Sequence, residues 1–388
     1  MKTVLVIFGG RSPEHDVSIV SAIAAVIKPL ELLNEYRVEP VYIAKDGAWY
    51  WDDRLKDVSL YRTGQVDQLM SKSNSPWLEF DGGLQLVKQQ SLGRVRKQRI
   101  DIVFPVMHGS HGEDGSLMGL LEMAGVPYVG CDVPSSALAM DKVLAKQVAG
   151  ANGIATGTWV WLTKQELTSD PTRAKAKISS LTYPLFVKPA HAGSSIGITK
   201  VASETELDNA LEVAAHYDSK IIVEEAVPNL IEVTLPIMGN AEPRPALLEQ
   251  PLTDADTFFD FETKYMHGGK KKMPGKKGGK LGAHGYSNLP AKLPGDLYKQ
   301  AETLGLDVYR ALGCSGTARI DMLIDSKAGK VYFNEINPMP GSLYAHNWRA
   351  AGVSGTELAK QLLRLAEERH IEAEKIQTSF STNFLKQF

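Results

Sequence analysis

The chain has 388 residues, of which 43% are hydrophobic, and a formal net charge of -2. This length allows two or three compact domains with a sizeable core. The near-neutral charge argues against nucleic acid as a main partner, and no apolar run approaches the length of a membrane span, so no membrane is expected either. The only cysteines are Cys131 and Cys314, too few for a disulfide framework or a zinc site. A reducing, cytoplasmic location is therefore expected.

The first segment predicts the start of an open parallel sheet. Val4–Phe8 is a buried type of strand, His15–Leu30 has apolar residues at helical spacing, and Arg37–Ile43 returns as a second strand. Ligands of such sheets bind at the carboxyl ends of the strands. The Gly-rich turn after the first strand lacks GxGxxG, so a dehydrogenase is weakly supported. Glu14, at the entrance of the helix, is typical of a favourable charge at the helix dipole.

The next segment predicts a loop that approaches a ligand closely. Residues 46–98 are predicted to be short strands and loops appended to the first unit. Ile100–Met107 is a stronger strand, and His108 opens the segment HGSHGEDG before a helix that runs through Ala124. Glycines, histidines and acids at the end of a strand favour close approach of a ligand, with a helix N-terminus behind it. Capping of that helix accounts for Asp114, whereas His108 is a candidate site residue.

A second unit is predicted to begin near Lys142, which opens another helix. The strand Leu185–Pro189 carries Lys188 and is followed by the Gly- and Ser-rich loop His191–Gly197. Such a loop offers successive backbone N–H groups to an anion, and both lysines could add charge beside a polyphosphate. Loops of this composition are also common connectors between strands.

Acidic residues then follow or occupy two further strands. Lys220–Val223 ends in Glu224 and Glu225, and Ile231–Met238 contains Glu232. Carboxylates at a strand exit can accept the hydroxyls of a ribose, or they can be solvated ends, which is the interpretation favoured for Glu225.

A lysine-rich segment comes next. Gly268–Gly282 holds six lysines among glycines, a composition typical of a mobile loop and here interpreted as a lid. A nucleic-acid patch is less favoured, because stacking aromatics are absent from the run. Leu297–Leu312 and Thr356–His370 are predicted helices, and Thr378–Phe388 is predicted to be a tail.

The stretch from Arg319 to Gly341 carries the strongest chemical signal. The apolar runs Ala318–Ile324 and Lys330–Ile336 flank a polar segment and predict a hairpin. A turn centred on Ala328 pairs Leu323 with Phe333, Asp321 with Glu335, and Arg319 with Asn337. Opposed acids about 5 Å apart at Cβ are unfavourable unless a cation lies between them. Two carboxylates and an amide suit Mg²⁺ or Mn²⁺ with substrate phosphates; a surface hairpin with scattered charges is the alternative.

Six motifs in this order resemble the D-alanine–D-alanine ligase family of the ATP-grasp superfamily. They are FGGRSPEHDVS, HGSHGEDGSLMGLLEMAGVPYVG, AMDK, VKPAHAGSSIGI, FFDFETKY and ARIDMLID followed by NEINPMPG. The resemblance implies an α/β, three-domain ATP-grasp fold with an N-terminal open parallel sheet. The implied domains are residues 1–133, a central ATP-grasp subdomain at 134–225, and a C-terminal subdomain at 226–388 with a mobile lid near 266–290.

The resemblance also implies roles for individual residues. Catalytic roles fall on Glu14, Ser194, Tyr265, Arg319 and Gly341. Substrate contacts fall on Glu14, His108, Lys264, Ser342 and His346. Contacts to ATP fall on Lys142, Lys188, Ser194, Ser195, Glu224, Glu232 and Phe258. Two Mg²⁺ or Mn²⁺ ions are expected on Asp321, Glu335 and Asn337.

The implied function is the ATP-dependent joining of two D-alanines, through an acyl phosphate, for peptidoglycan precursors, by a cytoplasmic homodimer. The chain departs from the family pattern at Pro338 and over Ser342–Trp348, where His346 occupies the position of a serine that holds the second substrate. One alternative is therefore a related dipeptide ligase with a different second amino acid. Another is a non-catalytic nucleotide-binding regulatory protein, which the intact set of charged residues disfavours.

Overall fold

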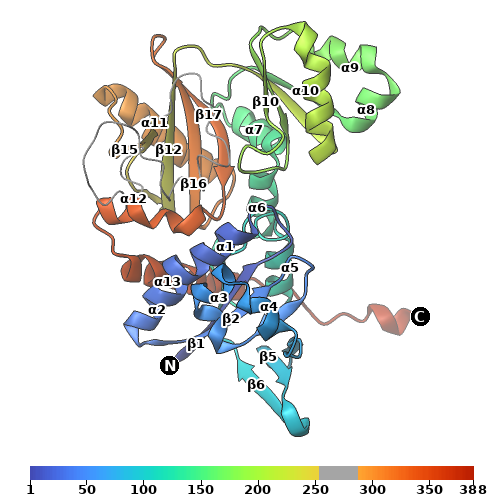
Figure 1. Cartoon of the computed structure of the whole chain (residues 1–388), viewed down its shortest axis with the longest axis vertical. Helices are drawn as coiled ribbons and strands as arrows, with labels where there is room; N and C mark the ends of the chain where they lie inside the picture. Colours follow the sequence, from blue (N-terminus) through green and yellow to red (C-terminus); the bar gives the residue numbers. More distant parts are fainter. Residues whose placement is uncertain (253–286) are drawn as a thin grey trace.

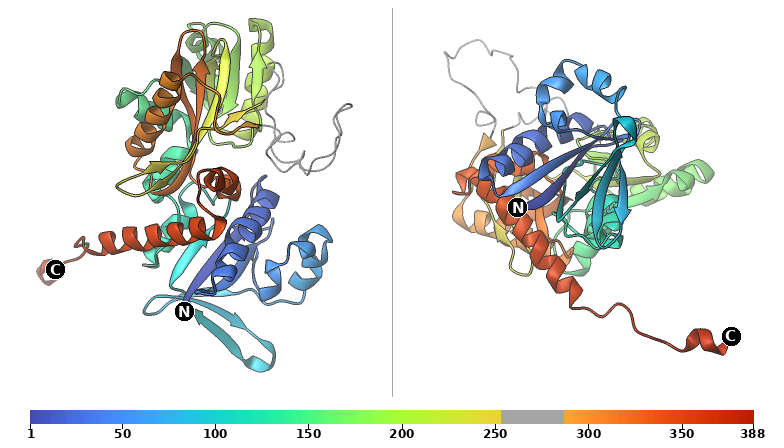
Figure 2. Two further views of the ribbon diagram at one scale, coloured as in Figure 1. Left: turned by 90° about the vertical axis from the view of Figure 1, so that its left-hand side faces the viewer. Right: turned by 90° about the horizontal axis from the view of Figure 1, so that it is seen from below.

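The computed structural model describes residues 1–252 and 287–388, in which the strands form three four-stranded sheets, one three-stranded sheet and one two-stranded sheet. The N-terminal unit lies at one end of the molecule, and two antiparallel sheets lie side by side at the other (Figure 1). Figure 2 shows from two further sides that the segment after α13 (Gly355–Glu374) extends away from the body as the predicted tail. Within the described ranges, no helix combines the length and apolar character needed to cross a membrane.

The N-terminal sheet has the order β3-β2-β1-β7, in which β2, β1 and β7 are parallel and β3 is antiparallel to β2. Its strands are β1 (Lys2–Gly9), β2 (Tyr36–Ile43), β3 (Trp49–Trp51) and β7 (Ile102–Pro105). Strand β1 is buried on both faces, because Val4 and Val6 belong to one hydrophobic core and Leu5 and Ile7 to another. The predicted open parallel sheet is confirmed.

The helix predicted at His15–Leu30 is divided into three parts. These are α1 (His15–Ser21), a π-helical stretch (Ala22–Ile27) and α2 (Lys28–Leu33). Pro29 has no N–H to donate to the preceding turn, which accounts for a break in the α-helical hydrogen bonding at this point. Helix α13 packs beside α2, and its leucines join the core that contains Val4.

Residues 46–98 hold more helix than the sequence predicted. Besides β3, they contain a 3₁₀ turn (Asp53–Lys56), α3 (Val58–Arg62), α4 (Gln65–Met70), β4 (Trp77–Phe80), β5 (Leu84–Gln89), a 3₁₀ turn (Ser91–Gly93) and β6 (Val95–Arg99). The three strands form an antiparallel sheet in the order β4-β5-β6. The prediction of strands and loops alone was wrong, because helices this short do not show a helical period.

The linking helices are α5 (Ser116–Met123), α6 (Val133–Met140) and α7 (Lys142–Ala151). The second sheet, β10-β9-β11-β8, is antiparallel, with β8 (Trp159–Thr163), β9 (Leu185–Pro189), β10 (Thr199–Val201) and β11 (Lys220–Glu225). Its helices are α8 (Lys164–Ser169), α9 (Pro171–Ile178) and α10 (Glu204–Tyr217). Apolar residues of α9 and α10 pack on β9 and β11, so this unit has its own core.

The third sheet, β13-β12-β16-β17, is also antiparallel. Its strands are β12 (Leu230–Gly239), β13 (Arg244–Pro245), β16 (Gly316–Asp325) and β17 (Lys330–Asn337); β14 (Gln250–Pro251) and β15 (Ser287–Asn288) form a separate pair. The remaining elements are α11 (Gly295–Ala311), a turn at Gly341–Tyr344, α12 (Ala345–Ala350) and a 3₁₀ turn at Phe384–Gln387. Residues of α11 pack on β12 and β16.

Strands β16 and β17 form the predicted hairpin. Arg319 lies opposite Asn337 and Asp321 lies opposite Glu335, as predicted. The predicted pairing of Leu323 with Phe333 was wrong, because the register shifts between Asp321 and Met322, and Leu323 lies opposite Tyr332. Asn334 is the extra residue of this bulge, and bulges often re-aim side chains beside active sites.

Candidate active site

A buried carboxylate at the end of β1 meets the Ser-rich loop that follows β9. Glu14 is buried at the start of α1, and the Ser194 hydroxyl donates a hydrogen bond to Glu14 Oε1. A Cβ at Gly193 would lie 3.1 Å from Glu14 Oε2, so the absent side chain allows the close approach. The predicted neighbours Glu14 and Ser194 thus lie together, although they are far apart in the sequence.

A second buried carboxylate, Glu113, was missed by the sequence reasoning. It accepts hydrogen bonds from the backbone N–H groups of Gly109 at 2.5 Å and Met339 at 3.3 Å. Burial, together with the charge of Glu14, raises the pKa of Glu113 to about 8, so it holds a proton at neutral pH. The acids within HGEDG were a signal for it.

His108, which the sequence predicted as a site residue, lies buried at the end of the strand that precedes this acid. Its Nε2 lies 3.1 Å from Ser21 Oγ, at the junction of α1 and the π-helical stretch. Burial lowers the pKa of His108, which favours a neutral imidazole. His108 therefore contributes a hydrogen-bonding ring, and no positive charge, beside the two carboxylates.

A cavity of about 70 Å³ lies between the two antiparallel sheets. Its lining includes Lys146, Phe186, Lys188, Glu224, Glu232, Leu323, Tyr332 and Asn334. Three of the predicted ATP contacts, Lys188, Glu224 and Glu232, therefore share one cavity. A more open depression between the end of α7 and α11 contains none of the predicted site residues.

Glu224 sits between two lysines in this cavity. Its carboxylate is 2.8 Å from Lys146 Nζ and 2.5 Å from Lys188 Nζ. Burial alone would raise the pKa of Glu224, but the two ammonium groups lower it to about 2. The sequence predicted Lys188 and Glu224 but missed Lys146, which lies one turn after Lys142 on α7 and is buried.

The opposed acids of the hairpin are compensated by side chains of the protein. Arg319 donates from Nε and Nη2 to the Asp321 carboxylate at 2.9 and 2.7 Å, and Lys142 Nζ lies 3.3 Å from Glu335 Oε2. Each of the two acids therefore has a cationic partner within the protein.

The hairpin also offers an oxygen donor set. Asn337 Oδ1 is buried and has no hydrogen-bond partner in the described part of the chain, a state that costs about 1–3 kcal/mol. Together with the carboxylates of Asp321 and Glu335 it fits Mg²⁺ or Mn²⁺. The described residues contain no group of three or more His, Cys, Asp or Glu that could hold a metal, so the amide and substrate oxygens are needed to complete a shell.

The turn after the hairpin has an unusual backbone. Ser342, Leu343 and Tyr344 all have positive φ, at 50°, 53° and 51°, a conformation that persists where the surroundings hold it. The Ser342 N–H donates to Ser21 Oγ at 2.8 Å. His346 Nε2 lies 2.8 Å from Glu249 Oε2, a buried acid that the sequence reasoning missed. His346 is thus held in place at the edge of the site.

Several predicted residues complete or adjoin this arrangement. Ser195 follows Ser194 in the same loop, and both have positive φ, at 61° and 52°. Gly341 opens the turn after the hairpin, and the Arg319 guanidinium lies 5.3 Å from the ring centre of Tyr344 in the same turn. Phe258, Lys264, Tyr265 and residues 266–286 of the lid predicted near 266–290 lie outside the described residues.

A cavity lies between two antiparallel sheets, lysines line it, and the adjoining hairpin carries hard oxygen donors. These features together define an ATP-grasp enzyme. Models of the D-ala D-ala ligase N-terminus and the D-ala D-ala ligase C-terminus match residues 3–131 and 148–364. The chain belongs to the D-alanine–D-alanine ligase family, which consists of ATP-dependent ligases. The resemblance and the fold class predicted from the sequence are confirmed.

Relatives cover nearly the whole chain. A D-alanine–D-alanine ligase from Acetivibrio thermocellus is 35% identical over 95% of this chain and 96% of its own length. One from Chlorobium luteolum is 38% identical over 94% and 97%. Among solved structures, the D-alanine-D-alanine ligase from Coxiella burnetii has a TM-score of 0.76 at 29% identity, covering 96% of each chain. VanG D-Ala:D-Ser ligase from Enterococcus faecalis has a TM-score of 0.76 at 33% identity, covering 94% of this chain and 99% of its own.

Proposed function

We propose that this protein is an ATP-dependent ligase that joins two D-alanines into D-alanyl-D-alanine, a component of peptidoglycan precursors. The hydrogen bond from Ser194 to Glu14 carries the proposal. Through this hydrogen bond Glu14, a buried acid that can bind an ammonium group, contacts the Ser-rich loop, which can bind phosphate. The relatives named D-alanine–D-alanine ligases over nearly the whole chain support this choice of amino acid.

In the first half-reaction the donor D-alanine is activated. Glu14 accepts hydrogen bonds from its ammonium group, and His108 lies beside it. Lys142, Lys188 and the backbone N–H groups of the Ser-rich loop offset the charge of the ATP phosphates. A carboxylate oxygen of the donor attacks the γ-phosphorus, the bond to ADP breaks, and an acyl phosphate forms.

In the second half-reaction the dipeptide forms. The amine of the acceptor attacks the acyl carbon, inorganic phosphate leaves with the bonding electrons, and the amine loses a proton. Arg319 and the backbone N–H of Gly341 face the developing oxyanion. Ser342 and His346 line the acceptor side.

The nucleotide and metal contacts complete the proposed site. Glu224 and Glu232 lie toward the adenosine and ribose, and Ser195 and Phe258 contact the nucleotide. Asp321, Glu335 and Asn337 would hold two Mg²⁺ or Mn²⁺ ions, which would supply electrostatic stabilisation of the transferring phosphoryl group. By the resemblance, Tyr265 takes a catalytic role and Lys264 contacts a substrate.

The proposed organisation has three domains in a cytoplasmic homodimer. Residues 1–133 bind the donor, residues 134–225 and 226–388 hold ATP between them, and a lid near 266–290 excludes water that would hydrolyse the acyl phosphate. The free, buried state of both cysteines suits a reducing compartment.

A different acceptor amino acid is the second candidate. The contact of His346 with Glu249 favours it, because His346 occupies the position where the family is expected to have a serine that holds the second substrate. Amino acids assayed in turn for ADP release with Mg²⁺ and ATP, with mass spectrometry of the products, separate the candidates. D-Ala-D-Ala supports the first and a mixed dipeptide the second. ADP release with no amino acid contradicts both, and a regulatory protein would bind ATP without turnover.

A further inference from the structure

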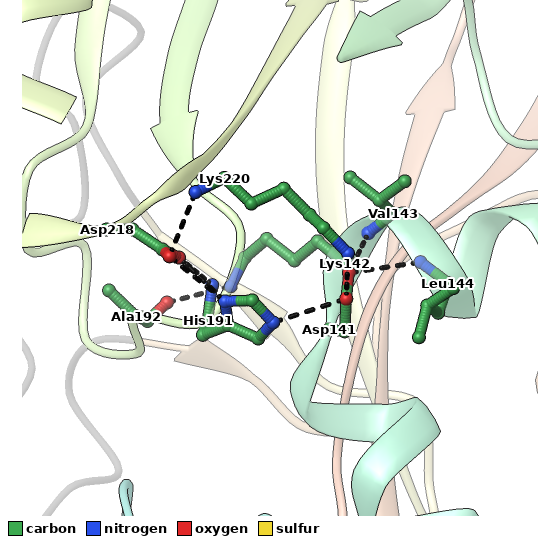
Figure 3. A network of polar contacts seen from close by, with 8 residues as sticks. All are labelled: Asp141, Lys142, Val143, Leu144, His191, Ala192, Asp218 and Lys220. Atoms are coloured by element: carbon green, nitrogen blue, oxygen red, sulfur yellow. Dashed lines mark hydrogen bonds and ion pairs between the residues drawn. The ribbon is translucent and has the colours of Figure 1, made fainter. Parts of the chain in front are cut away.

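The Ser-rich loop is anchored at its root by a cluster of charged side chains, Asp141, His191, Asp218 and Lys220 (Figure 3). We propose that His191, as an imidazolium held between Asp141 and Asp218, is a positioning residue. It sets the place of the loop 192–197 against the N-terminus of α7, and this clamp opens at alkaline pH. The inference rests on the proposed function, in which this loop binds the phosphates of ATP.

The hydrogen bonding of His191 requires both ring nitrogens to be donors. Nδ1 lies 2.9 and 3.1 Å from the two carboxylate oxygens of Asp218, and Nε2 lies 3.2 Å from Asp141 Oδ2. Ionised carboxylates only accept hydrogen bonds, and a neutral imidazole carries a single N–H. Only the protonated ring therefore satisfies both contacts. The backbone N–H of His191 also donates to Asp218 Oδ2 at 2.7 Å, which fixes the first residue of the loop.

Asp141 transmits this contact to α7. It is the N-cap of that helix and accepts from the N–H groups of Val143 and Leu144 at 2.9 and 3.1 Å, while Lys220 Nζ lies 2.5 Å from its other oxygen. The side chain of Asp141 is 5% exposed, so its position is well defined. His191 is thus bonded to the residue that starts the helix carrying Lys142.

Lys142 itself binds the loop on both sides of His191. Its backbone N–H donates to the carbonyl of Ala190 at 3.1 Å, and its Nζ donates to the carbonyl of Ala192 at 2.8 Å. These two contacts, together with the hydrogen bond between His191 and Asp141, fix the root of the loop against the start of α7. A shift of His191 would move both the loop and an ammonium group that we assign to the phosphates.

The loop beyond the clamp has a backbone that needs support. Ser194 and Ser195 occupy the left-handed region, with φ of 52° and 61°, which non-glycine residues adopt where the surrounding structure holds them. The Ser194 hydroxyl reaches Glu14 in the N-terminal unit. The geometry of the donor and phosphate sites therefore depends on where the loop begins.

The surroundings keep the ring protonated at neutral pH. The hydrogen bond to Asp141 and, to a lesser extent, that to Asp218 raise the pKa of His191 to about 9, although burial lowers it. The charged groups packed around it are Asp141 and Lys142 of α7, Asp218 before β11, and Lys220 of β11. A raised pKa means that the clamp is complete below pH 6.5 and is lost as the pH rises through about 9.

Three variants test the clamp. His191→Gln removes the charge and one donor, His191→Arg keeps a permanent charge, and His216→Gln alters an exposed histidine at the end of α10 as the matched control. For each, the KM for ATP and for D-alanine is measured from pH 7 to pH 10 by ADP release. Hydrogen exchange of the amides of residues 192–197, corrected for the intrinsic rate, reports the loop without any turnover.

We expect His191→Gln to raise the KM for ATP about tenfold at pH 7.5, the loss typical of one charge-assisted hydrogen bond, and to speed exchange of the loop. In wild type and His216→Gln, the KM for ATP and the exchange rate of the loop should rise to the values of His191→Gln only above about pH 9. In His191→Arg, both quantities at pH 10 should stay at the values that wild type has at pH 7.5. A wild-type KM and exchange rate in His191→Gln would overturn the clamp. The clamp would also be overturned if the KM for ATP rose at alkaline pH in His191→Arg as much as in wild type. If the exchange data fit the clamp but wild type released no ADP, the clamp would stand and the proposed function would be contradicted.

Discussion

The buried group of Glu224, Lys146 and Lys188 offers a quantitative test of the nucleotide cavity. Glu224→Gln removes the carboxylate that both ammonium groups contact. The lowering of its pKa from 4.5 to about 2 corresponds to about 3 kcal/mol of stability. All three side chains are at most 10% exposed, so solvent screening is small, and breaking a buried ion pair costs about 3–5 kcal/mol. We expect the variant to lose about 3–5 kcal/mol.

Urea unfolding followed by tryptophan fluorescence is the suitable assay. Trp159 and Trp161 lie on β8, which pairs with β11, the strand that carries Glu224. Glu225→Gln is the matched control, because this neighbouring acid accepts a hydrogen bond from the Thr182 N–H at an exposed position. The control should change stability by less than about 1 kcal/mol.

The pH dependence adds a second reading of the same substitution. A carboxyl group with a lowered pKa contributes stability above pH 4.5 and loses it as the pH falls toward 2. Wild type and Glu224→Gln should therefore converge in acid. A loss below 1 kcal/mol at pH 7, or a constant difference down to pH 2.5, would refute the argument that this carboxylate holds the two lysines.

Three further substitutions test other parts of the structure. Asp321→Asn should lower the turnover number at least ~100-fold, because a metal ligand is lost. It should lower the free energy of unfolding by only about 1 kcal/mol in thermal unfolding, because the ion pair of Asp321 with Arg319 is partly exposed. An unchanged turnover number would overturn the metal assignment. Because burial and Glu14 raise the pKa of Glu113 to about 8, wild type should lose stability as the pH rises from 4.5 to 8, and Glu113→Gln should flatten that slope in calorimetry. Arg369→Ala removes a hydrogen bond to the carbonyl of Tyr128 at 2.9 Å and should lower the free energy of unfolding by about 2–3 kcal/mol; an unchanged melting temperature would contradict this.

The hairpin shows what the sequence alone could predict and where it failed. Alternation of side chains and the length of the polar turn were enough to place Asp321 opposite Glu335. They could not predict the bulge at Asn334, which shifts the pairing of Leu323 to Tyr332. The reason is that a bulge adds one residue to one strand and leaves no distinct pattern in a single sequence.

The cations and acids around the site show the same limit. Lys142, Lys188 and Glu224 were predicted because their motifs are local. Lys146 and Glu249 were missed because their partners come from distant segments. Lys146 Nζ, for example, donates to the carbonyl of Phe333 at 3.2 Å, a residue 187 positions away. Contacts of this kind depend on how the sheets pack, which no local period encodes.

Transfer of oxygen from the donor to phosphate tests the central claim most directly. The enzyme is incubated with Mg²⁺, ATP and D-alanine labelled with ¹⁸O in its carboxylate, and the released phosphate and dipeptide are analysed by mass spectrometry. If the carboxylate attacks the γ-phosphorus and phosphate leaves from the acyl carbon, each D-alanyl-D-alanine is accompanied by one phosphate carrying one ¹⁸O. Unlabelled phosphate, or ADP formed without any dipeptide, would contradict the account.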